Sequence, residues 1–216
     1  MKQKKETLII FSAHSDDFVL GAGGTIAKYA QAGSKVFCIV FSYGEKSHPW
    51  MKKDVIKDVR AKEAFKASAT LDCKTQFLDL QEGQFYEDYQ QQQKSLELLT
   101  FLRSKKPTKI FTHSEEDPHP DHRAVHKITL ELYKALQSKP EIYAYSIWNP
   151  VTFKSQYPSF YVDISGTFSL KRKAIRLFSS QKVHIALLTY FLVPYRALKD
   201  GFRVSKLFGE QFFRIR

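Results

Sequence analysis

Short runs of β-branched and aromatic residues alternate along the chain with longer segments in which apolar residues recur at helical spacing. The short runs predict buried strands over residues 7–13, 35–41, 75–80, 108–113, 142–147 and 159–164. The longer segments predict helices over residues 18–31, 54–70, 90–104 and 121–136, and a mostly helical stretch over 170–199. Strands that alternate with helices indicate βαβ units, so the pattern predicts an α/β fold whose parallel sheet is covered on both faces.

Two helices carry apolar residues at positions that we expect to share one buried face. These positions are Val55, Val59, Phe65 and Leu71 in the second helix, and Leu96, Leu99 and Leu102 in the third. Gly33 follows the first helix, where a glycine favours the left-handed cap that ends a helix.

The chain of 216 residues is predicted to form a single domain over residues 1–216, since a typical domain has roughly 150. No linker, repeat or low-complexity segment longer than Gln90–Gln93 interrupts it. Cys38 and Cys73 cannot form a disulfide framework, which favours a reducing compartment. The longest apolar run, 185–195, is shorter than the ~20 residues of a membrane-spanning helix, and the apolar stretch before His14 is too short for a signal peptide. We therefore expect a soluble, cytoplasmic protein.

Two polar loops face each other across the predicted sheet. In a doubly wound sheet of order 3-2-1-4-5, strands 1 and 4 are neighbours at the switch point, where ligands bind at the carboxyl ends of the strands. The loop after strand 1 reads Ala13-His14-Ser15-Asp16-Asp17. A helix N-cap would explain one of these carboxylates, but neither the other carboxylate nor the histidine. The alternative is a metal site with a spare carboxylate as base.

The glycines that follow this loop are Gly21, Gly23 and Gly24. They do not have the GxGxxG spacing of a phosphate-binding loop, and they lie inside the predicted helix. Two adjacent aspartates would also repel a phosphate. We expect these glycines to allow close packing against a strand or the floor of the site.

The loop after strand 4 and the helix that follows it concentrate histidines. His113, His119, His122 and His126 fall within fourteen residues. Pro120 suits the first position of a helix and keeps His119 extended. His122 and His126 have the spacing found in zincins, but the glutamate of HExxH is absent, so we expect His126 to support the site or pack beside it.

Together the two loops contain the components of a mononuclear hydrolytic zinc site. Two histidines and a carboxylate leave one coordination position open, as catalytic zinc requires. The metal lowers the pKa of a bound water toward ~7 and polarises a carbonyl group. A free carboxylate can accept the proton of the water, and a further histidine can stabilise the oxyanion. The residues alone therefore predict metal-assisted hydrolysis of an amide.

These residues resemble the PIG-L/LmbE-like family of zinc-dependent N-deacetylases. The family motif AHPDDE matches Ala13-His14-Ser15-Asp16-Asp17-Phe18 at four of six positions, and the motif HxDH matches His119-Pro120-Asp121-His122 fully. Weaker family-like features follow in the same order: Arg60 with Glu63, Lys171 with Ala174 and Ser180-Gln181, and Glu210 with Phe212. The resemblance covers nearly the whole chain.

The resemblance implies a Rossmann-like, three-layer fold with a mostly parallel sheet and its active site at the carboxyl ends of strands 1 and 4. It implies one Zn²⁺ per chain, held by His14, Asp17 and His122. Asp16 would be the general base. The implied substrate is an N-acetylated amino sugar, typically an N-acetylglucosaminyl group on a lipid, a thiol precursor or an oligosaccharide.

Three further residues receive roles from the resemblance. His119 would stabilise the oxyanion and protonate the leaving amine, and Asp121 would orient and charge its imidazole. Arg60 would bind substrate, or else form a structural salt bridge with Glu63 one turn away. Two positions depart from the family motif: Ser15 replaces a proline, which loosens the loop, and Phe18 replaces a glutamate, which affects the expected substrate preference more than the metal.

The chain is strongly basic, with 34 lysines and arginines, 22 acidic residues and a net charge of +12. Such a charge attracts polyanions, but the basic residues are scattered and form no nucleic-acid-binding motif, so we expect no specific nucleic acid partner. The alternative to an enzyme is a non-catalytic α/β protein that binds an anionic polymer or membrane and holds a structural metal. An open metal position and a free Asp16 discriminate against it.

Residues 183–198 are apolar and aromatic almost all round, and basic residues flank them on both sides. A helix of this kind is usually buried in a core or in an interface between copies of a chain, which here would make a homo-oligomer. The alternative is peripheral contact with an anionic membrane, with the apolar side inserted and the basic flanks at the headgroups. Pro194 argues against one continuous helix.

Overall fold

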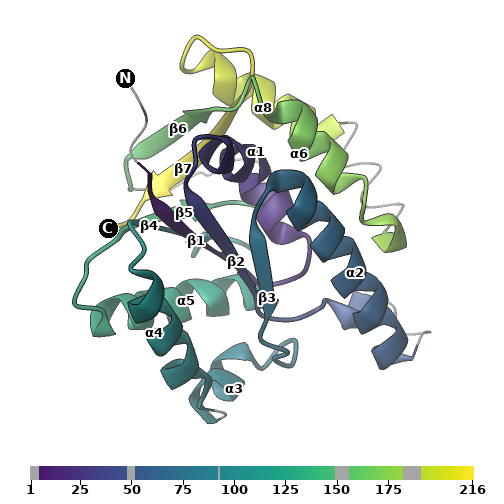
Figure 1. Ribbon diagram of the computed structural model, residues 1–216, viewed down its shortest axis with the longest axis vertical. Helices are drawn as coiled ribbons and strands as arrows, with labels where there is room; N and C mark the ends of the chain where they lie inside the picture. Colours follow the sequence, from purple (N-terminus) through teal and green to yellow (C-terminus); the bar gives the residue numbers. More distant parts are fainter. Residues whose placement is uncertain (1–4, 48–51, 92, 149–155, 182–190) are drawn as a thin grey trace.

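The computed structural model describes residues 5–47, 52–91, 93–148, 156–181 and 191–216. Its centre is a seven-stranded sheet of order β3-β2-β1-β4-β5-β7-β6. The strands are β1 (Thr7–Ser12), β2 (Lys35–Val40), β3 (Lys74–Phe77), β4 (Lys109–His113), β5 (Glu141–Tyr145), β6 (Ser159–Asp163) and β7 (Gly209–Arg214). Strands β1 to β5 pair in parallel, whereas β7 is antiparallel to β5 and β6 (Figure 1). The predicted α/β fold and the order 3-2-1-4-5 are confirmed.

Helices cover both faces of the sheet (Figure 1). One face carries α1 (Asp17–Gln31), α2 (Lys53–Leu71), α6 (Phe168–Ile175) and α8 (Val193–Phe202), and the other carries α3 (Phe85–Gln91), α4 (Lys94–Lys105) and α5 (Pro120–Ala135). Side chains alternate along β1, so Leu8 and Ile10 enter the first core while Ile9 and Phe11 enter the second. Short 3-10 helices lie at Glu45–Ser47 (η1) and Ser179–Gln181 (η2).

The buried face predicted for α2 is right at Leu71, which is 1% exposed, and wrong at two other positions. Val55 and Phe65 are 48% and 51% exposed, whereas Ile56 is buried. Arg60 and Glu63 are buried on this helix too. The apolar residues of the sequence do show the helical period. Two charged side chains nevertheless occupy the buried face of α2, because they have hydrogen-bond partners there, as described below.

The helix predicted over residues 90–104 is also corrected. It is two helices, α3 and α4, and the N-cap residue of α4, Gln93, has a left-handed backbone with a φ of 55°. Leu96 is 60% exposed, and Leu98 takes the buried position with Leu102. Gly33 has a φ of +83° just after α1, which confirms the predicted left-handed end of that helix.

Strand β7 was not predicted, and it ties the C-terminal part of the chain to α1. The carboxylate of Glu210 accepts the backbone N–H groups of Gly24 and Thr25 at 2.9 and 2.7 Å. Nζ of the buried Lys171 lies 2.7 Å from the same carboxylate. The stretch predicted as mostly helical over 170–199 contains the end of α6, η2 and the start of α8, and residues 182–190 lie outside the described part of the chain.

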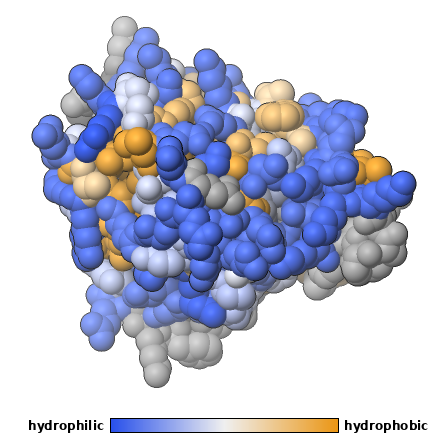
Figure 2. Space-filling model, turned by 90° about the horizontal axis from the view of Figure 1, so that it is seen from below, coloured by the Kyte–Doolittle hydropathy of each residue, from blue (hydrophilic) through white to orange (hydrophobic). Residues whose placement is uncertain are grey.

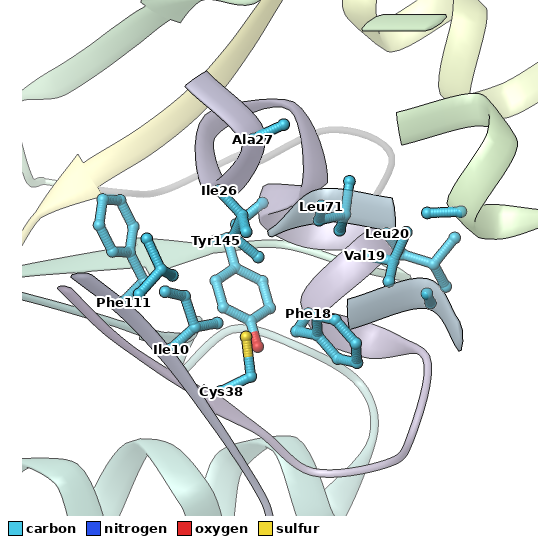
Figure 3. Packing of buried hydrophobic residues seen from close by; sticks show 14 of the residues in the cluster. Ile10, Phe18, Val19, Leu20, Ile26, Ala27, Cys38, Leu71, Phe111 and Tyr145 are labelled. Carbon is cyan, nitrogen blue, oxygen red and sulfur yellow. The ribbon is translucent and has the colours of Figure 1, made fainter. Parts of the chain in front are cut away.

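Close packing between α1 and the sheet depends on glycines, as predicted. A Cβ at Gly21 would overlap the ring of Tyr145, and one at Gly24 would lie 2.7 Å from Cδ1 of Ile164. Phe18, at the start of α1, is fully buried in the same core as Tyr145 and Cys38 (Figure 3).

The surface in the view of Figure 2 is mostly hydrophilic, with hydrophobic side chains exposed in small groups. Over the described residues, no helix has both the length and the apolar character needed to cross a membrane.

Candidate metal and active site

The carboxyl ends of β1 and β4 carry the two loops that the sequence singles out. The two strands are parallel neighbours, with Ile9 opposite Ile110, so the chain leaves both at the same edge of the sheet. His14 and Asp17 come just after β1, and His122 lies in the first turn of α5, after β4. The predicted meeting of these loops at one edge is confirmed.

His14, Asp17 and His122 form a group that can hold a metal ion. The atoms that their side chains offer as ligands lie within 4.8 Å of one another. Oδ2 of Asp17 is 3.3 Å from Nδ1 of His14 and 3.4 Å from Nε2 of His122. This Nε2 atom is buried and has no hydrogen-bond partner within the described structure. A buried nitrogen without a partner beside a carboxylate suits a cation, so these residues fit the expected metal.

The same side chains shift one another's pKa values. Burial lowers the pKa of His14, but hydrogen bonds to Asp121 and Asp17 outweigh it and raise this pKa to about 10. Burial also lowers the pKa of His122, but Asp17 and Asp117 outweigh it and raise this pKa to about 9. Burial raises the pKa of Asp17, yet His122 and His14 hold it well below its ordinary value. The site thus stabilises positive charge, which a divalent ion can supply in place of the protons.

Asp117 belongs to neither motif, yet it fixes the orientation of His122. Oδ1 of Asp117 lies 3.0 Å from Nδ1 of His122, and Oδ2 accepts the backbone N–H groups of Ile147 and Trp148 at 3.3 and 3.4 Å. Metal-binding histidines commonly donate their second ring N–H to a carboxylate, which sets the tautomer and the ring direction. In the sequence, Asp117 is indicated only by its place in the histidine-rich loop. The two glutamates before it, Glu115 and Glu116, do not have this orienting role.

His119 is the N-cap of α5, as Pro120 predicts. Its backbone is extended, with φ −75° and ψ 125°, and its Nδ1 accepts the N–H of Asp121 at 3.2 Å. The ring proton of the neutral imidazole is therefore on Nε2. Burial and the charges of His14 and His122 lower the pKa of His119, which favours this neutral form. A neutral imidazole with a proton on Nε2 is suited to donate a hydrogen bond to an oxyanion.

The carboxylate of Asp121 lies closer to His14 than to the His119 ring. Its Oδ2 lies 3.3 Å from Nε2 of His14 but 4.0 Å from Nδ1 of His119. Its Oδ1 accepts the backbone N–H of Gly83 at 2.8 Å. Nδ1 of His119 thus accepts its hydrogen bond from the backbone of Asp121, and the Asp121 carboxylate raises the pKa of His119 less than burial, His14 and His122 lower it. Asp121 contacts a predicted metal ligand and links α5 to the loop before α3.

Asp16 is the N-cap residue of α1, but its side chain pairs with Arg60. The Asp16 side chain makes no capping hydrogen bond, and its Oδ1 lies 3.4 Å from Nη2 of Arg60. Arg60 is 1% exposed; its Nε donates to Oγ of Ser15 at 2.9 Å and its Nη1 to the carbonyl oxygen of Gly44 at 3.1 Å. Burial raises the pKa of Asp16, although the Arg60 guanidinium opposes this. The geometry places Arg60 to position the carboxylate rather than to reach a substrate.

Residues of the weaker family-like features surround the same pair. The carboxylate of Glu63 accepts hydrogen bonds from the backbone N–H and the hydroxyl of Ser180, both at 2.7 Å. When the side-chain amide of Gln181 is oriented so that both its nitrogen and its oxygen have hydrogen-bond partners, the nitrogen donates to Oδ2 of Asp16 at 3.0 Å. Segment η2 thus packs on α2 and reaches the predicted base.

The remaining two histidines of the cluster support the loops. Nε2 of His113 accepts the backbone N–H of Ala13 at 2.9 Å, and burial together with the charge of His122 holds the pKa of His113 well below its ordinary value. Nδ1 of His126 lies 2.8 Å from the carbonyl oxygen of His113. His126 therefore has the supporting position expected of it.

The sequence model described as "PIG-L: GlcNAc-PI de-N-acetylase" matches residues 9–133, more than half of the chain. The chain belongs to the PIG-L family. It is 26% identical over 201 residues to the 4-oxalmesaconate hydratase of Pseudomonas putida, covering 84% of this chain and 76% of the relative. An enzyme of the PIG-L superfamily, with residues that can bind a divalent metal, is therefore supported.

Solved structures share the PIG-L fold over nearly the whole chain. The P. putida 4-carboxy-2-hydroxymuconate hydratase GalB superposes with a TM-score of 0.84 at 22% identity, covering 98% of this chain and 96% of that one. The N,N'-diacetylchitobiose deacetylase of Pyrococcus horikoshii superposes with a TM-score of 0.80 at 22% identity, covering 97% of this chain and 84% of that one. The predicted Rossmann-like fold is confirmed, and the structures that share it include both a hydratase and a deacetylase.

Two departures from the PIG-L motif have structural explanations. Ser15 is fully buried, and its hydroxyl accepts the hydrogen bond from Arg60, so the loop is held where the loss of a proline was expected to loosen it. Phe18 lies in the hydrophobic core, and its backbone N–H donates to Oγ of Ser12 at 3.0 Å. Its side chain therefore packs with the apolar residues of Figure 3 rather than with the metal-binding group.

Proposed function

We propose that this PIG-L family member is a zinc-dependent N-deacetylase that removes the acetyl group of an N-acetylated amino sugar. The observation that carries the proposal is the grouping of three potential ligands, His14, Asp17 and His122, with a carboxylate that stays outside it. Asp16 adjoins Asp17 in the chain but belongs to none of the potential metal-binding groups of the described residues.

A divalent zinc ion bound by these residues would supply the Lewis acid that polarises the acetyl carbonyl and makes water acidic. Asp16 accepts the proton of the attacking water. Its buried carboxylate has a raised pKa, which brings its basicity closer to neutral pH, where a general base works best. Arg60, Ser15 and Gln181 hold the carboxylate and its loop in place.

His119 stabilises the negative charge that develops on the carbonyl oxygen. Its side chain is 38% exposed, so it can meet a substrate, while its ring lies 4.9 Å from that of His14, centroid to centroid. Nε2 carries the donated proton because Nδ1 is occupied by the N–H of Asp121. The departing amine takes a proton as the C–N bond breaks, and Asp16, which holds the proton taken from the water, is the group proposed to deliver it, because the neutral His119 ring keeps its Nε2 proton for the oxyanion.

The charge around the site favours a neutral acetamido group over a polyanionic substrate. Four aspartates lie in the described surroundings of the proposed metal, where they pair with His14, His122 and Arg60: Asp16, Asp17, Asp117 and Asp121. The Arg60 guanidinium is buried against Asp16, Ser15 and Gly44. A substrate with several carboxylates would need cationic partners here, whereas an N-acetyl sugar would not.

A hydratase is the second candidate, since the relative that matches 84% of this chain is a 4-oxalmesaconate hydratase. Hydration also requires activated water and a base, so the same side chains can serve it. The two candidates differ in product: one releases acetate and an amine, and the other consumes a carbon–carbon double bond.

The test measures acetate release from N-acetylglucosamine, N,N'-diacetylchitobiose and a lipid-linked N-acetylglucosaminide, with zinc and with a chelator. Asp16→Asn and His119→Ala should each lower the rate on the order of 10²–10⁴-fold with zinc content unchanged, while Glu116→Gln serves as the control. Loss of 4-oxalmesaconate absorbance without acetate release would identify a hydratase. Turnover of neither substrate class would favour the non-catalytic alternative with a structural metal.

A further inference from the structure

An exposed apolar surface runs along α8 and the turn that follows it. Five of the nine large apolar side chains that are exposed among the described residues lie on it: Phe191 at 69%, Tyr195 at 63%, Leu198 at 48%, Phe202 at 87% and Leu207 at 62%. Tyr195, Leu198 and Phe202 are spaced by three and four residues, which places them on one face of α8, and Phe191 lies just before this helix. We call these five residues the α8 surface.

The opposite side of α8 is packed against the protein, so the α8 surface is a fixed feature of the fold. Val193 and Ala197 are buried in the core shared with α1 and α6. A Cβ at Gly201 would lie 2.7 Å from the carbonyl oxygen of Lys206, so the helix and the following turn are in close contact. An amphipathic helix normally turns its apolar side inward, and α8 has apolar residues on both sides.

The polar residues around the α8 surface are basic. Lys199, Arg203 and Lys206 line an open groove of about 850 Å³ together with Leu198, Phe202 and Leu207. Asp200 is the acidic residue of the segment 191–208, and it is only 7% exposed. A partner that covers this surface therefore meets apolar and aromatic groups beside positive charges.

We propose that the α8 surface docks on an anionic lipid membrane. Exposed aromatic and leucine side chains beside lysine and arginine are the combination that holds a helix in the membrane interface, with the apolar groups at the acyl boundary and the cations at the headgroups. Pairing with a second copy across a two-fold axis would bring the same basic residues toward one another. Charge complementarity thus selects the anionic lipid. This replaces the expected contact over 183–198, half of which lies outside the described residues.

The docked helix would lie next to the metal-binding loops. On the inner side of α8, Nη1 of Arg196 donates to the carbonyl oxygens of Ser146 and Ile147 at 3.3 and 2.7 Å. The backbone N–H of Ile147 in turn donates to Asp117. The lipid surface and the proposed active site are therefore separated by one helix and one loop, whichever reaction the site performs.

The experiment is co-sedimentation of the full chain with vesicles of phosphatidylcholine alone or mixed with phosphatidylglycerol, at low and moderate salt. We expect binding to the mixed vesicles that weakens with salt. Phe202→Ser should lower the partition coefficient about tenfold, and Lys206→Gln about fivefold. The matched controls are Phe65→Ser and Lys62→Gln on α2, whose side chains are also exposed and which should bind like the wild type.

Unchanged thermal unfolding of each variant ensures that lost binding is not lost folding. The proposal is overturned if the chain binds neither vesicle, or if it binds phosphatidylcholine alone equally well. It is also overturned if Phe65→Ser weakens binding as much as Phe202→Ser does. A dimer in solution that Phe202→Ser converts to a monomer, without vesicle binding, would assign the α8 surface to a second copy instead.

Discussion

Nδ1 of His122 lies 3.0 Å from Oδ1 of Asp117, and both side chains are fully buried. The backbone N–H groups of Ile147 and Trp148 hold the other oxygen of this carboxylate. Asp117 therefore fixes the ring of His122 so that its Nε2 is directed at Oδ2 of Asp17, 3.4 Å away. The loop after β5 thereby controls the direction of a ligand that is supplied by α5.

Asp117→Ala should weaken metal affinity by about 10–100-fold, the usual effect of removing a carboxylate that orients a metal-binding histidine. The measurement is zinc titration against a competing chelator. Glu116→Gln, in the same loop, is the matched control and should bind zinc as the wild type does. Equal affinities for Asp117→Ala and the wild type would contradict an orienting role.

Arg60→Gln should shift the acid limb of the pH–rate profile to higher pH. The Arg60 guanidinium lowers the pKa of Asp16 against the raising effect of burial, so its removal raises that pKa further. A general base works only when deprotonated, so the limb should move to higher pH. The accompanying loss should be in kcat rather than KM, because Arg60 is 1% exposed. An unchanged profile with a raised KM would instead assign Arg60 to substrate binding.

Zinc affinity should rise with pH from weakly acidic to alkaline solution. The pKa values of His14 and His122 are raised to about 10 and about 9. In the metal-free protein, the protonated rings stabilise the fold fully below the ordinary pKa of 6.5. This stabilisation is lost as the pH rises through the raised pKa values. Zinc must displace these protons, which predicts a gain of about ten- to a hundredfold per pH unit.

The check is a zinc titration at about pH 6 and about pH 8, corrected for the protonation of the competing chelator. An affinity that does not change between these conditions would show that neither histidine loses a proton on binding. The thermal stability lost on chelation should accordingly be larger at the higher pH.

The central strands could be predicted because they are continuous apolar runs buried on both sides, as Thr7–Ser12 is. Helical spacing predicted α2 and α4 but only part of their buried faces. Leu71 and Leu102 are buried as predicted, whereas Phe65 is exposed and Arg60 is buried by its hydrogen bonds. Strand β7 escaped prediction because its pairing with β5 and β6 depends on distant parts of the chain.

The residues of the candidate site could also be predicted only in part. The motif residues His14, Asp17 and His122 were predicted, and the structure brings them together. Asp117 could not be singled out, because one carboxylate among three adjacent acidic residues has no pattern that indicates its partner. The position of Asp121 depends on which nitrogen of His119 accepts the backbone N–H, a feature of three-dimensional geometry.

The metal content of the purified protein tests the central claim most directly. Elemental analysis should find one divalent ion per chain in the wild type, and this ion should be lost from His14→Ala and His122→Ala. His126→Ala is the control, because its ring lies on the same helix as His122 but contacts the carbonyl oxygen of His113. Metal retained in that control and absent from the other two variants is the predicted result. Undiminished metal in His14→Ala and His122→Ala would contradict the proposed site.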